Sequence, residues 1–178
     1  ISAANSTSGN QLYIKDLRKK GSPIQQIVES FEKNHDVIHS VGDVIYIKTD
    51  LNAPNGKVVK MTLAKSAPDQ WVDFIPETEH VLSPSSGSGF FFAKYMVDAI
   101  TKVIQYDSKG NNLGEVKLPG IGTAGGFNGK KEIDLLVRMN ARGLFGILAI
   151  PLRPFIGLFQ FNGTGSVSNT TWKTSIFS

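Results

Sequence analysis

The sequence predicts an all-β protein built from repeated antiparallel sheets, and two observations carry this prediction. Three short alternating segments recur about 45 residues apart. They are Leu12–Leu17, Lys57–Thr62 and Lys102–Asp107. The second observation is that 18 of the 178 residues are glycine, which fits many short strands joined by turns. A fixed period of this length with several strands in each unit indicates blades of a β-propeller.

Further candidate strands lie on both sides of each recurring segment. A strand that opens from glycine precedes each one, at Gly42–Ile47, Gly89–Lys94 and from Gly129 onward. An outer strand follows each one, at Gln26–Val28, Trp71–Phe74 and Leu113–Val116. A weaker fourth unit lies at Leu158–Asn162 and Trp172–Ile176. We therefore expect an incomplete β-propeller of about three to four four-stranded antiparallel blades. The alternative is a generic antiparallel β domain with coincidental spacing. If the blades are real, Tyr13, Val58 and Val103 should occupy matching positions.

The composition limits the partners that we expect. With 40% hydrophobic and 19% charged residues, the chain can build a folded core. The net charge is only +4, and Arg18-Lys19-Lys20, the one cationic run of three, is expected to be a solvated turn. We predict no nucleic-acid partner, because that function needs a concentrated basic face. No stretch reaches the roughly 18 apolar residues of a membrane span, so no membrane partner is predicted. Without cysteine, disulfides and thiolate metal sites are excluded.

One glycine motif could hold a cofactor. Gly120–Gly125 matches G-x-G-x-x-G, which in dinucleotide-binding folds opens a helix beneath a pyrophosphate. Pro119 precedes the motif here, and the two further glycines Gly126 and Gly129 would weaken any helix that started there. We interpret the motif as a connection between blades and expect no cofactor. A dinucleotide-dependent enzyme would require a helix that begins at this motif.

The histidines do not form an obvious metal site. His35 and His39 are four residues apart, but the β-branched residues between them indicate a strand. On a strand this spacing places the two residues about 13 Å apart, which is too far for one zinc ion. His80 would have to converge on them from another blade. We therefore predict no metal site.

No serine is placed as a nucleophile. The sequence has no G-x-S-x-G, the motif that presents the catalytic serine of α/β-hydrolases. The serine-rich stretch Ser83–Gly89 is expected to be a loop that leads into the strand at Phe90. We therefore assign no catalytic residue to this sequence.

Four ordered motifs lie within the first 131 residues. The first is Thr49–Asn55, followed by Lys57-Val58-Val59. The other three lie at Trp71–Glu79, at Tyr95–Ala99 with Ile104–Asp107, and at Gly122–Lys131. These motifs resemble the propeller domain of the prolyl oligopeptidase family of serine peptidases. In that family a strand ends in T-(N/D)-x-x-(A/S)-P-N before a basic residue and an aliphatic pair, and the later motifs are W-x-x-x-(I/V)-P-E, a Y-x-x-(D/H) and Q-x-x-D blade, and G-(S/T)-x-x-G-(F/Y)-(S/N)-G-K-K.

The resemblance implies a function for the whole parent protein. Members of this family carry a seven-bladed propeller on an α/β-hydrolase domain and cut short peptides after proline. Their catalytic Ser, Asp and His lie in the hydrolase domain, and no position of this sequence matches them. The implied role of this chain is a non-catalytic, substrate-gating part of such an enzyme, inactive alone. Its implied partners are the hydrolase domain and, through the parent enzyme, peptide substrates.

The resemblance also implies a location and several structural roles. The parent enzyme is expected to be soluble and to lie in the cytoplasm or the periplasm. Pro54 is expected to fix the turn that leaves its strand, and Trp71 and Tyr106 are expected to pack between blades. The alternative function is a stand-alone β-propeller that binds a peptide or a protein. A following G-x-S-x-G in the gene would favour the peptidase, and a stop codon after Ser178 would favour the binding module.

The resemblance is interrupted between residues 132 and 157. We expect residues 1–178 to be one propeller fragment, family-like over 1–131 and about 158–178. The codons allowed for Leu144–Gly157, read one base earlier, permit Trp-Tyr-Phe-Ser-Tyr and a threonine-rich run, which is similar to the family pattern. We hypothesise that a frameshift produced residues 133–157. A genuine insertion or a divergent blade edge is the alternative.

The frameshift hypothesis makes a prediction about solubility. Leu144–Ile150 is nearly all apolar, and Pro151 and Pro154 would each remove a donor from a strand ladder. An exposed apolar edge promotes association, so the isolated chain should be poorly soluble or oligomeric. Replacing residues 133–157 with the frame-corrected strand should improve solubility and raise the midpoint of unfolding, measured by size-exclusion chromatography and thermal denaturation. A monodisperse, cooperatively unfolding monomer that the replacement does not improve would contradict the hypothesis.

Overall fold

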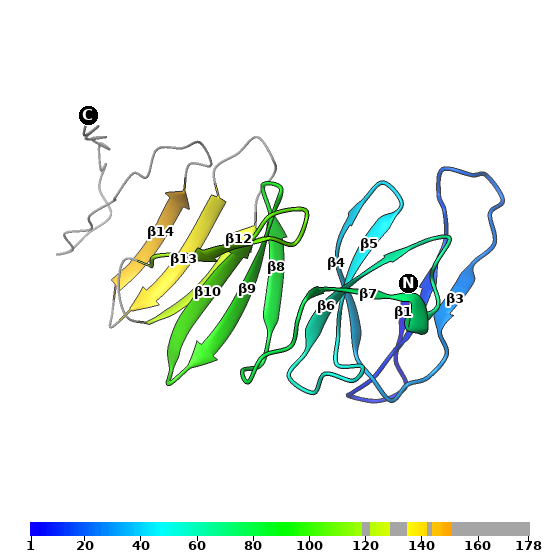
Figure 1. Ribbon diagram of the computed structural model, residues 1–178, viewed down its shortest axis with the longest axis horizontal. Coiled ribbons are helices and arrows are strands. Elements are labelled where there is room, and N and C mark those ends of the chain that lie inside the picture. Colours follow the sequence, from blue (N-terminus) through cyan, green and yellow to red (C-terminus); the bar gives the residue numbers. More distant parts are fainter. Residues whose placement is uncertain (119–121, 129–134, 142–143, 151–178) are drawn as a thin grey trace. The chain divides into compact units, whose positions relative to one another are not determined.

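The computed structural model describes residues 1–118, 122–128, 135–141 and 144–150. Every regular element in these ranges is a β-strand, apart from the single 3₁₀ turn η1 (Pro68–Gln70). The chain divides after Pro84 into two compact units. The prediction of an all-β fold is confirmed (Figure 1).

Unit 1 contains two antiparallel sheets. A three-stranded sheet is formed by β1 (Ser2–Ala3), β2 (Gln11–Ile14) and β3 (Gln25–Val28). A four-stranded sheet is formed by β4 (His35–Val41), β5 (Val44–Thr49), β6 (Lys57–Thr62) and β7 (Val72–Ile75). In both sheets each strand pairs with the strand that follows it in the sequence, which is the arrangement within a propeller blade.

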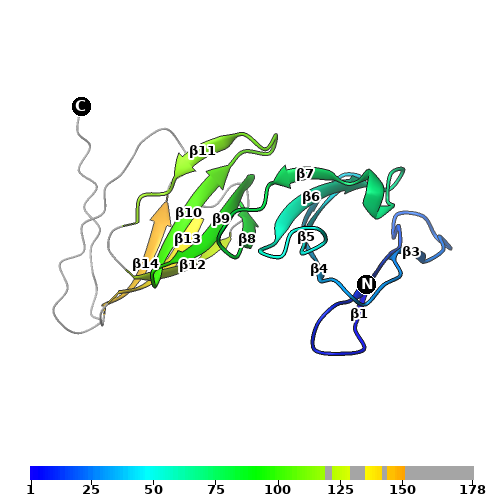
Figure 2. The same cartoon turned by 60° about the horizontal axis from the view of Figure 1, so that its bottom comes forward.

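Unit 2 repeats this arrangement. Its four-stranded sheet is formed by β8 (Ser83–Gly87), whose first two residues precede the division, β9 (Phe90–Val97), β10 (Ile100–Tyr106) and β11 (Asn112–Glu115). Its three-stranded sheet is formed by β12 (Thr123–Asn128), β13 (Leu135–Ala141) and β14 (Leu144–Ile150). The strands of each sheet run side by side in both views (Figure 1 and Figure 2).

The recurring strands occupy equivalent places in their sheets. β2, β6 and β10 each lie between a hairpin partner and the last strand of the sheet, as the 45-residue period predicted. The expected outer strands are β3, β7 and β11, and the strands expected after glycine include β5 and β9. One expected match is off by a residue. Leu12 pairs with Val28 and Val58 pairs with Ile75, and a bulge follows at once in both strands. Leu12, rather than Tyr13, is therefore the counterpart of Val58.

The expectation of a loop at Ser83–Gly89 was wrong over most of its length. Residues 83–87 form β8, the edge strand of its sheet, where Pro84 can be accommodated because one side of the strand needs no donor. Ser88 and Gly89 form the two-residue turn to β9 with φ angles of 54° and 85°. Two successive residues with left-handed backbone conformation match the twist of the strands in a β-hairpin. Ser88 and Gly89 therefore mark a hairpin turn and not the end of a long loop.

The core of unit 1 lies between its two sheets. Leu12, Ile27 and Val28 of the first sheet and Ile47, Val59 and Met61 of the second form one buried cluster. Trp71 packs against this cluster, and its indole N–H donates to the carbonyl of Ser66 at 2.9 Å. The prediction that Trp71 packs between two sheets is confirmed. Because neither sheet can bury its apolar face alone, this cluster joins them.

Unit 2 has an equivalent core. Phe92 and Val103 of the four-stranded sheet pack with Ala124 and Phe127 of β12. The rings of Phe92 and Phe127 lie 5.3 Å apart between centroids and are inclined by 33°. Tyr106 is also buried, and burial raises the pKa of its hydroxyl. Two sheets again share one apolar layer.

The described part of the glycine motif confirms that it opens no helix. β12 begins at Thr123, immediately after Gly122, and residues 119–121 lie outside the described ranges. Of the segment predicted to be anomalous, β13 and β14 form an antiparallel hairpin from Leu135 opposite Ile150 to Ala141 opposite Leu144. The expected fourth-unit strands at 158–162 and 172–176 lie outside the described residues.

Two glycines provide a matched test of the close packing in unit 1. Gly9 and Gly21 have φ angles of 78° and 79°, so alanine would be strained to a similar degree at both positions. A Cβ atom on Gly9 would lie 1.7 Å from the carbonyl oxygen of Phe31, whereas a Cβ on Gly21 would meet nothing within 4 Å.

Gly9→Ala should therefore lower the free energy of unfolding by about 1–3 kcal/mol more than Gly21→Ala. Urea denaturation followed by tryptophan fluorescence measures the difference. Equal losses for the two variants would show that the backbone around Phe31 can move away at no cost.

Candidate functional site

Three polar side chains are buried where the two sheets of unit 1 meet. Asn10, His35 and Thr49 are 8%, 2% and 1% exposed. The side-chain amide of Asn10 accepts the backbone N–H of His35 at 2.7 Å and donates to the carbonyl of His35 at 2.9 Å. The backbone N–H of Asn10 donates to Lys33 O at 2.9 Å. One residue before β2 therefore binds both polar groups of the first residue of β4.

Thr49 fixes the imidazole of His35. The Thr49 hydroxyl lies 2.9 Å from Nδ1 of His35 and accepts the backbone N–H of Leu51 at 3.0 Å. Donation from the hydroxyl to Nδ1 satisfies both groups and leaves the proton of a neutral imidazole on Nε2. The imidazole also contacts the Trp71 ring edge to face, with centroids 5.6 Å apart. Burial lowers the pKa of His35, against the smaller opposing effects of Asp50 and Asp36.

A more exposed set of hydrogen bonds surrounds this buried group. The carboxylate of Asp50 accepts the backbone N–H of Asn34 at 2.8 Å and its side-chain amide at 2.7 Å. The Oδ1 atom of Asn34 accepts the backbone N–H of Gly9 at 2.9 Å. The loop before β2, the connection before β4 and the turn after β5 are therefore held together at one point.

A similar set of bonds recurs in unit 2. Thr101, near the start of β10, donates its backbone N–H to Gly122 O at 3.0 Å, and its hydroxyl accepts the backbone N–H of Ala124 at 3.0 Å. Asn10 binds residues 33 and 35 in the same way, two positions apart on the approach to β4. We call this arrangement the strand clamp: a polar residue at the start of the second-last strand of one sheet binds the first strand of the next sheet.

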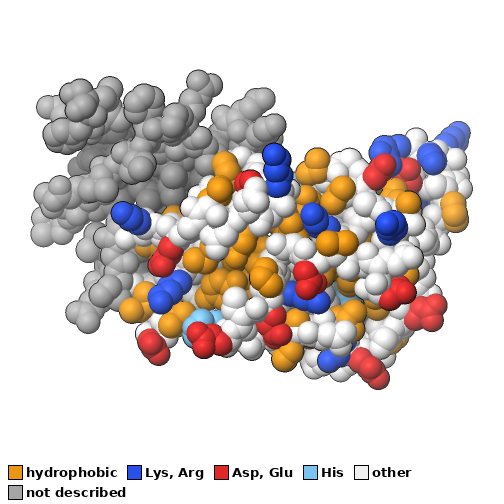
Figure 3. Space-filling view, viewed as in Figure 1, with side chains coloured by type: hydrophobic (Ala, Val, Ile, Leu, Met, Phe, Trp, Pro, Cys, Tyr) orange, Lys and Arg blue, Asp and Glu red, His pale blue; other side chains and the backbone are white. Residues whose placement is uncertain are grey.

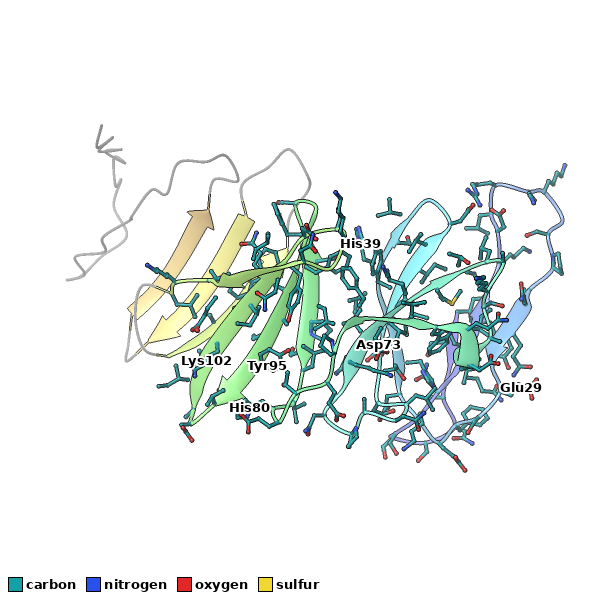
Figure 4. All side chains as sticks on the ribbon, in the orientation of Figure 1. Glu29, His39, Asp73, His80, Tyr95 and Lys102 are labelled. Atoms are coloured by element: carbon teal, nitrogen blue, oxygen red, sulfur yellow. The ribbon has the colours of Figure 1, made fainter. Side chains whose placement is uncertain are left out.

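An open groove lies beside this site in unit 1. Its volume is ≈ 660 Å³. It is lined by Gln26–Ser30, Glu32, Lys33, His35, Leu51, Asn52 and Ser66–Pro68. The side-chain amide of Gln25 donates to the hydroxyl of Ser66 at 3.0 Å, which joins the two sides near the groove. Figure 4 labels Glu29, which follows the end of β3.

The three histidines do not converge. His35 and His39 both lie on β4, as predicted, but His35 is buried while the ring of His39 packs against Tyr46 with centroids 6.0 Å apart. His80 lies 3.5 Å from the carboxylate of Glu79 at a separate place in the unit (Figure 4). Over the described residues, no three His, Cys, Asp or Glu side chains gather in a way that could hold a metal ion.

Sequence reasoning missed the strand clamp and the groove. His35 was considered only as a metal ligand, and Asn10 was not singled out. The available signal was the placement of polar residues at the ends of otherwise apolar strands, as in Asn10 before Leu12 and Thr49 after Ile47. Such a pattern is also common in solvated turns, so it gave no reason to expect burial.

Comparison with known proteins identifies the family. The model of the prolyl oligopeptidase N-terminal β-propeller domain matches residues 1–141. The chain belongs to the prolyl oligopeptidase family. The match runs beyond Lys131 and takes in β13. It also identifies the four sheets as parts of a β-propeller fold.

Individual relatives agree with this assignment. The chain is 48% identical over 131 residues to the prolyl endopeptidase of Elizabethkingia miricola, covering 74% of this chain and 18% of that protein. A structure from a study of two prolyl endopeptidases superposes with a TM-score of 0.74 at 24% identity, covering 83% of this chain and 22% of the other. The structure of prolyl oligopeptidase B from Galerina marginata bound to a 35mer substrate superposes with a TM-score of 0.67 at 27% identity. This match covers 78% of this chain and 20% of the other. The chain thus spans about a fifth of the length of these relatives.

The family motifs have structural roles in this propeller domain. Pro54 lies in a turn in which the backbone N–H of Gly56 donates to the carbonyl of Ala53 at 2.7 Å. The predicted turn at Pro54 is therefore present. The backbone N–H of Asn55 donates to the carboxylate of Glu77 at 2.6 Å, and Leu82 N–H donates to Asn55 O at 2.8 Å. The two motifs that contain Pro54 and Glu77 therefore meet at one turn.

The surface charges of the described residues are mixed in sign. Cationic and anionic side chains are interspersed on the face shown in Figure 3. Arg18 lies in the expected exposed turn, where its guanidinium binds Asp16 at 2.9 Å and Asp43 at 2.7 Å. No helix within the described ranges is long and apolar enough to cross a membrane.

The buried imidazole predicts a pH dependence of stability. Burial lowers the pKa of His35 in the folded state below 6.5, the ordinary pKa of histidine. As the pH falls through that value, the unfolded chain therefore binds more protons than the folded chain. The free energy of unfolding should therefore decrease between about pH 7.5 and pH 5, as His35 titrates in the unfolded state. Urea denaturation across this range measures the slope.

His35→Gln should reduce this slope, because it removes the imidazole whose burial lowers its pKa. An unchanged slope in His35→Gln would show that other groups govern the pH dependence.

Proposed function

We propose that this chain is part of the propeller of a serine endopeptidase that cuts short peptides after proline. In that enzyme the propeller covers a separate hydrolase domain and limits access to it, and the chain itself performs no chemistry. The observation that carries the proposal is the match of the N-terminal propeller model over residues 1–141. The 48% identity to a prolyl endopeptidase supports the substrate class.

The way in which the sheets are joined supports a role in limiting substrate access. Each unit consists of two sheets joined by an apolar layer, and the strand clamp binds successive sheets through buried polar groups. Buried and satisfied hydrogen bonds of this kind specify one arrangement of the sheets. A propeller held in this way can exclude large substrates, because moving its sheets apart requires the strand-clamp hydrogen bonds to break. The proposed partners are the hydrolase domain and, through the parent enzyme, peptides such as the 35mer bound by the Galerina marginata relative.

A stand-alone peptide-binding or protein-binding propeller is the second candidate. The open groove of unit 1 favours it, because such a groove can bind a ligand without a hydrolase domain. The gene sequence separates the two functions. A G-x-S-x-G motif downstream in the same reading frame supports the peptidase, and its absence from the intact gene supports the binding module.

The chain alone should neither cleave a proline-containing chromogenic peptide nor react with a serine-directed fluorophosphonate. The same residues should support catalysis when they are joined to a hydrolase domain. A chimera in which residues 1–141 replace the matching segment of the Elizabethkingia miricola prolyl endopeptidase should cleave the peptide. The parent enzyme is the positive control.

Two results would contradict the proposal. One is labelling of any serine in the isolated chain, since none lies in a nucleophile motif. The other is a chimera that folds, as judged by cooperative unfolding, and still cannot cleave short proline-containing peptides.

A further inference from the structure

The groove of unit 1 is lined in part by β3, which is an edge strand of its sheet. β3 is the last strand of its sheet, and over the described residues it pairs with β2 on one side and with no strand on the other. Ile27 and Val28 line the groove although their side chains are buried in the core. The lining takes in the five consecutive residues Gln26–Ser30, so it follows the chain of β3 and is not confined to every second residue. An unpaired strand edge of this kind is a template for another extended segment.

The opposite side of the groove could hold the side chains of such a segment. Leu51 and Pro68 are half-buried and Ala67 is exposed, so they offer apolar contact close to the edge of β3. Glu29 and Glu32 are both exposed, and Lys33 is the one cationic residue of the lining. The lining thus carries two carboxylates against one ammonium group, and its charge complements a basic ligand.

From these features we propose that the groove binds an extended peptide with alternating basic and apolar side chains, which adds to β3 as a further strand. Backbone hydrogen bonds to β3 supply affinity, as in other cases of strand addition. Alternation places the basic side chains on one face and the apolar side chains on the other. One face meets Glu29 and Glu32, and the other meets Leu51 and Pro68. β3 has four residues, so the bound strand is about four residues long.

This site is distinct from the proposed gating function and does not rest on it. The gating function concerns access to a hydrolase domain. The groove concerns a surface that unit 1 carries by itself, so either proposal can fail while the other stands.

The test uses the full 178-residue chain and fluorescein-labelled peptides. The probe is Lys-Val-Lys-Val-Thr-Val, and the charge control is Glu-Val-Glu-Val-Thr-Val. A third peptide has the probe sequence with N-methylated alternate amides, which cannot donate backbone hydrogen bonds. The probe should bind saturably in a fluorescence polarisation titration, the acidic peptide more weakly, and the N-methylated peptide should not bind. Amide chemical shifts should change at residues 26–30, 51–52 and 66–68.

Charge reversal tests the groove residues directly. Glu29→Lys and Glu32→Lys should each weaken binding of the probe by about two- to fivefold, the range expected for one exposed ion pair. Glu79→Lys is the matched control, because Glu79 is 86% exposed in the same unit and lies outside the groove lining. It should leave the affinity unchanged. If a reversed variant does not fold, Glu29→Gln and Glu32→Gln remove the charge with little change in shape and should weaken binding in the same direction.

Several results would overturn the proposal. They are no saturable binding of the probe up to about 1 mM, the weakest affinity that the titration can define, equal binding of the N-methylated peptide, and equal weakening by Glu79→Lys. Shifts at residues 26–30 that grow with protein concentration alone would show that a second copy of the chain, rather than a peptide, occupies the edge.

Discussion

Each unit depends on the hydrogen bonds that join the second-last strand of one sheet to the first strand of the next. Asn10 binds both backbone polar groups of His35, and Thr101 binds Ala124 and Gly122 in a similar way. These bonds are buried, and losing one partner would leave a buried polar group unsatisfied at about 1–3 kcal/mol. The apolar layers hold the sheets together, but apolar contact is not directional. The polar bonds determine which residues face each other across the layer.

The clamp and the bonds around it also show what the polar side chains of unit 1 do. His35 has the side chain most suited to acid–base work, but its Nδ1 is paired with Thr49 and its ring is packed against Trp71. A buried imidazole with a lowered pKa stabilises the junction as a neutral hydrogen-bonding group. Asn34 likewise donates to the carboxylate of Asp50 and accepts the backbone N–H of Gly9. The polar residues of unit 1 thus hold elements in place, which agrees with the proposed role as part of a gating domain.

The groove beside β3 shows how a structural repeat can leave a surface for binding. A blade ends in an outer strand, and the outer strand of the first sheet has one unpaired edge over the described residues. The loops at Leu51 and at Ser66–Pro68 come from the second sheet and line the same groove as β3. The residues of β3, the carboxylates of Glu29 and Glu32 and the loops of the second sheet therefore line one groove. A peptide at this site would contact residues of both sheets.

The sequence by itself determined the strand order, the blade period and the family, because these follow from local patterns. Alternation at Lys57–Thr62, the turn chemistry of Ala53–Gly56 and the repeated glycines each act over a few residues. It failed at Ser83–Gly87, where polar residues form an edge strand, and at Tyr13, where a bulge moves the register by one residue. Tertiary structure alone decided the burial of Asn10 and His35 and the groove at β3. Those features depend on the meeting of segments that lie 25 and 41 residues apart in the sequence, since a polar side chain is buried only when a distant strand supplies its partner.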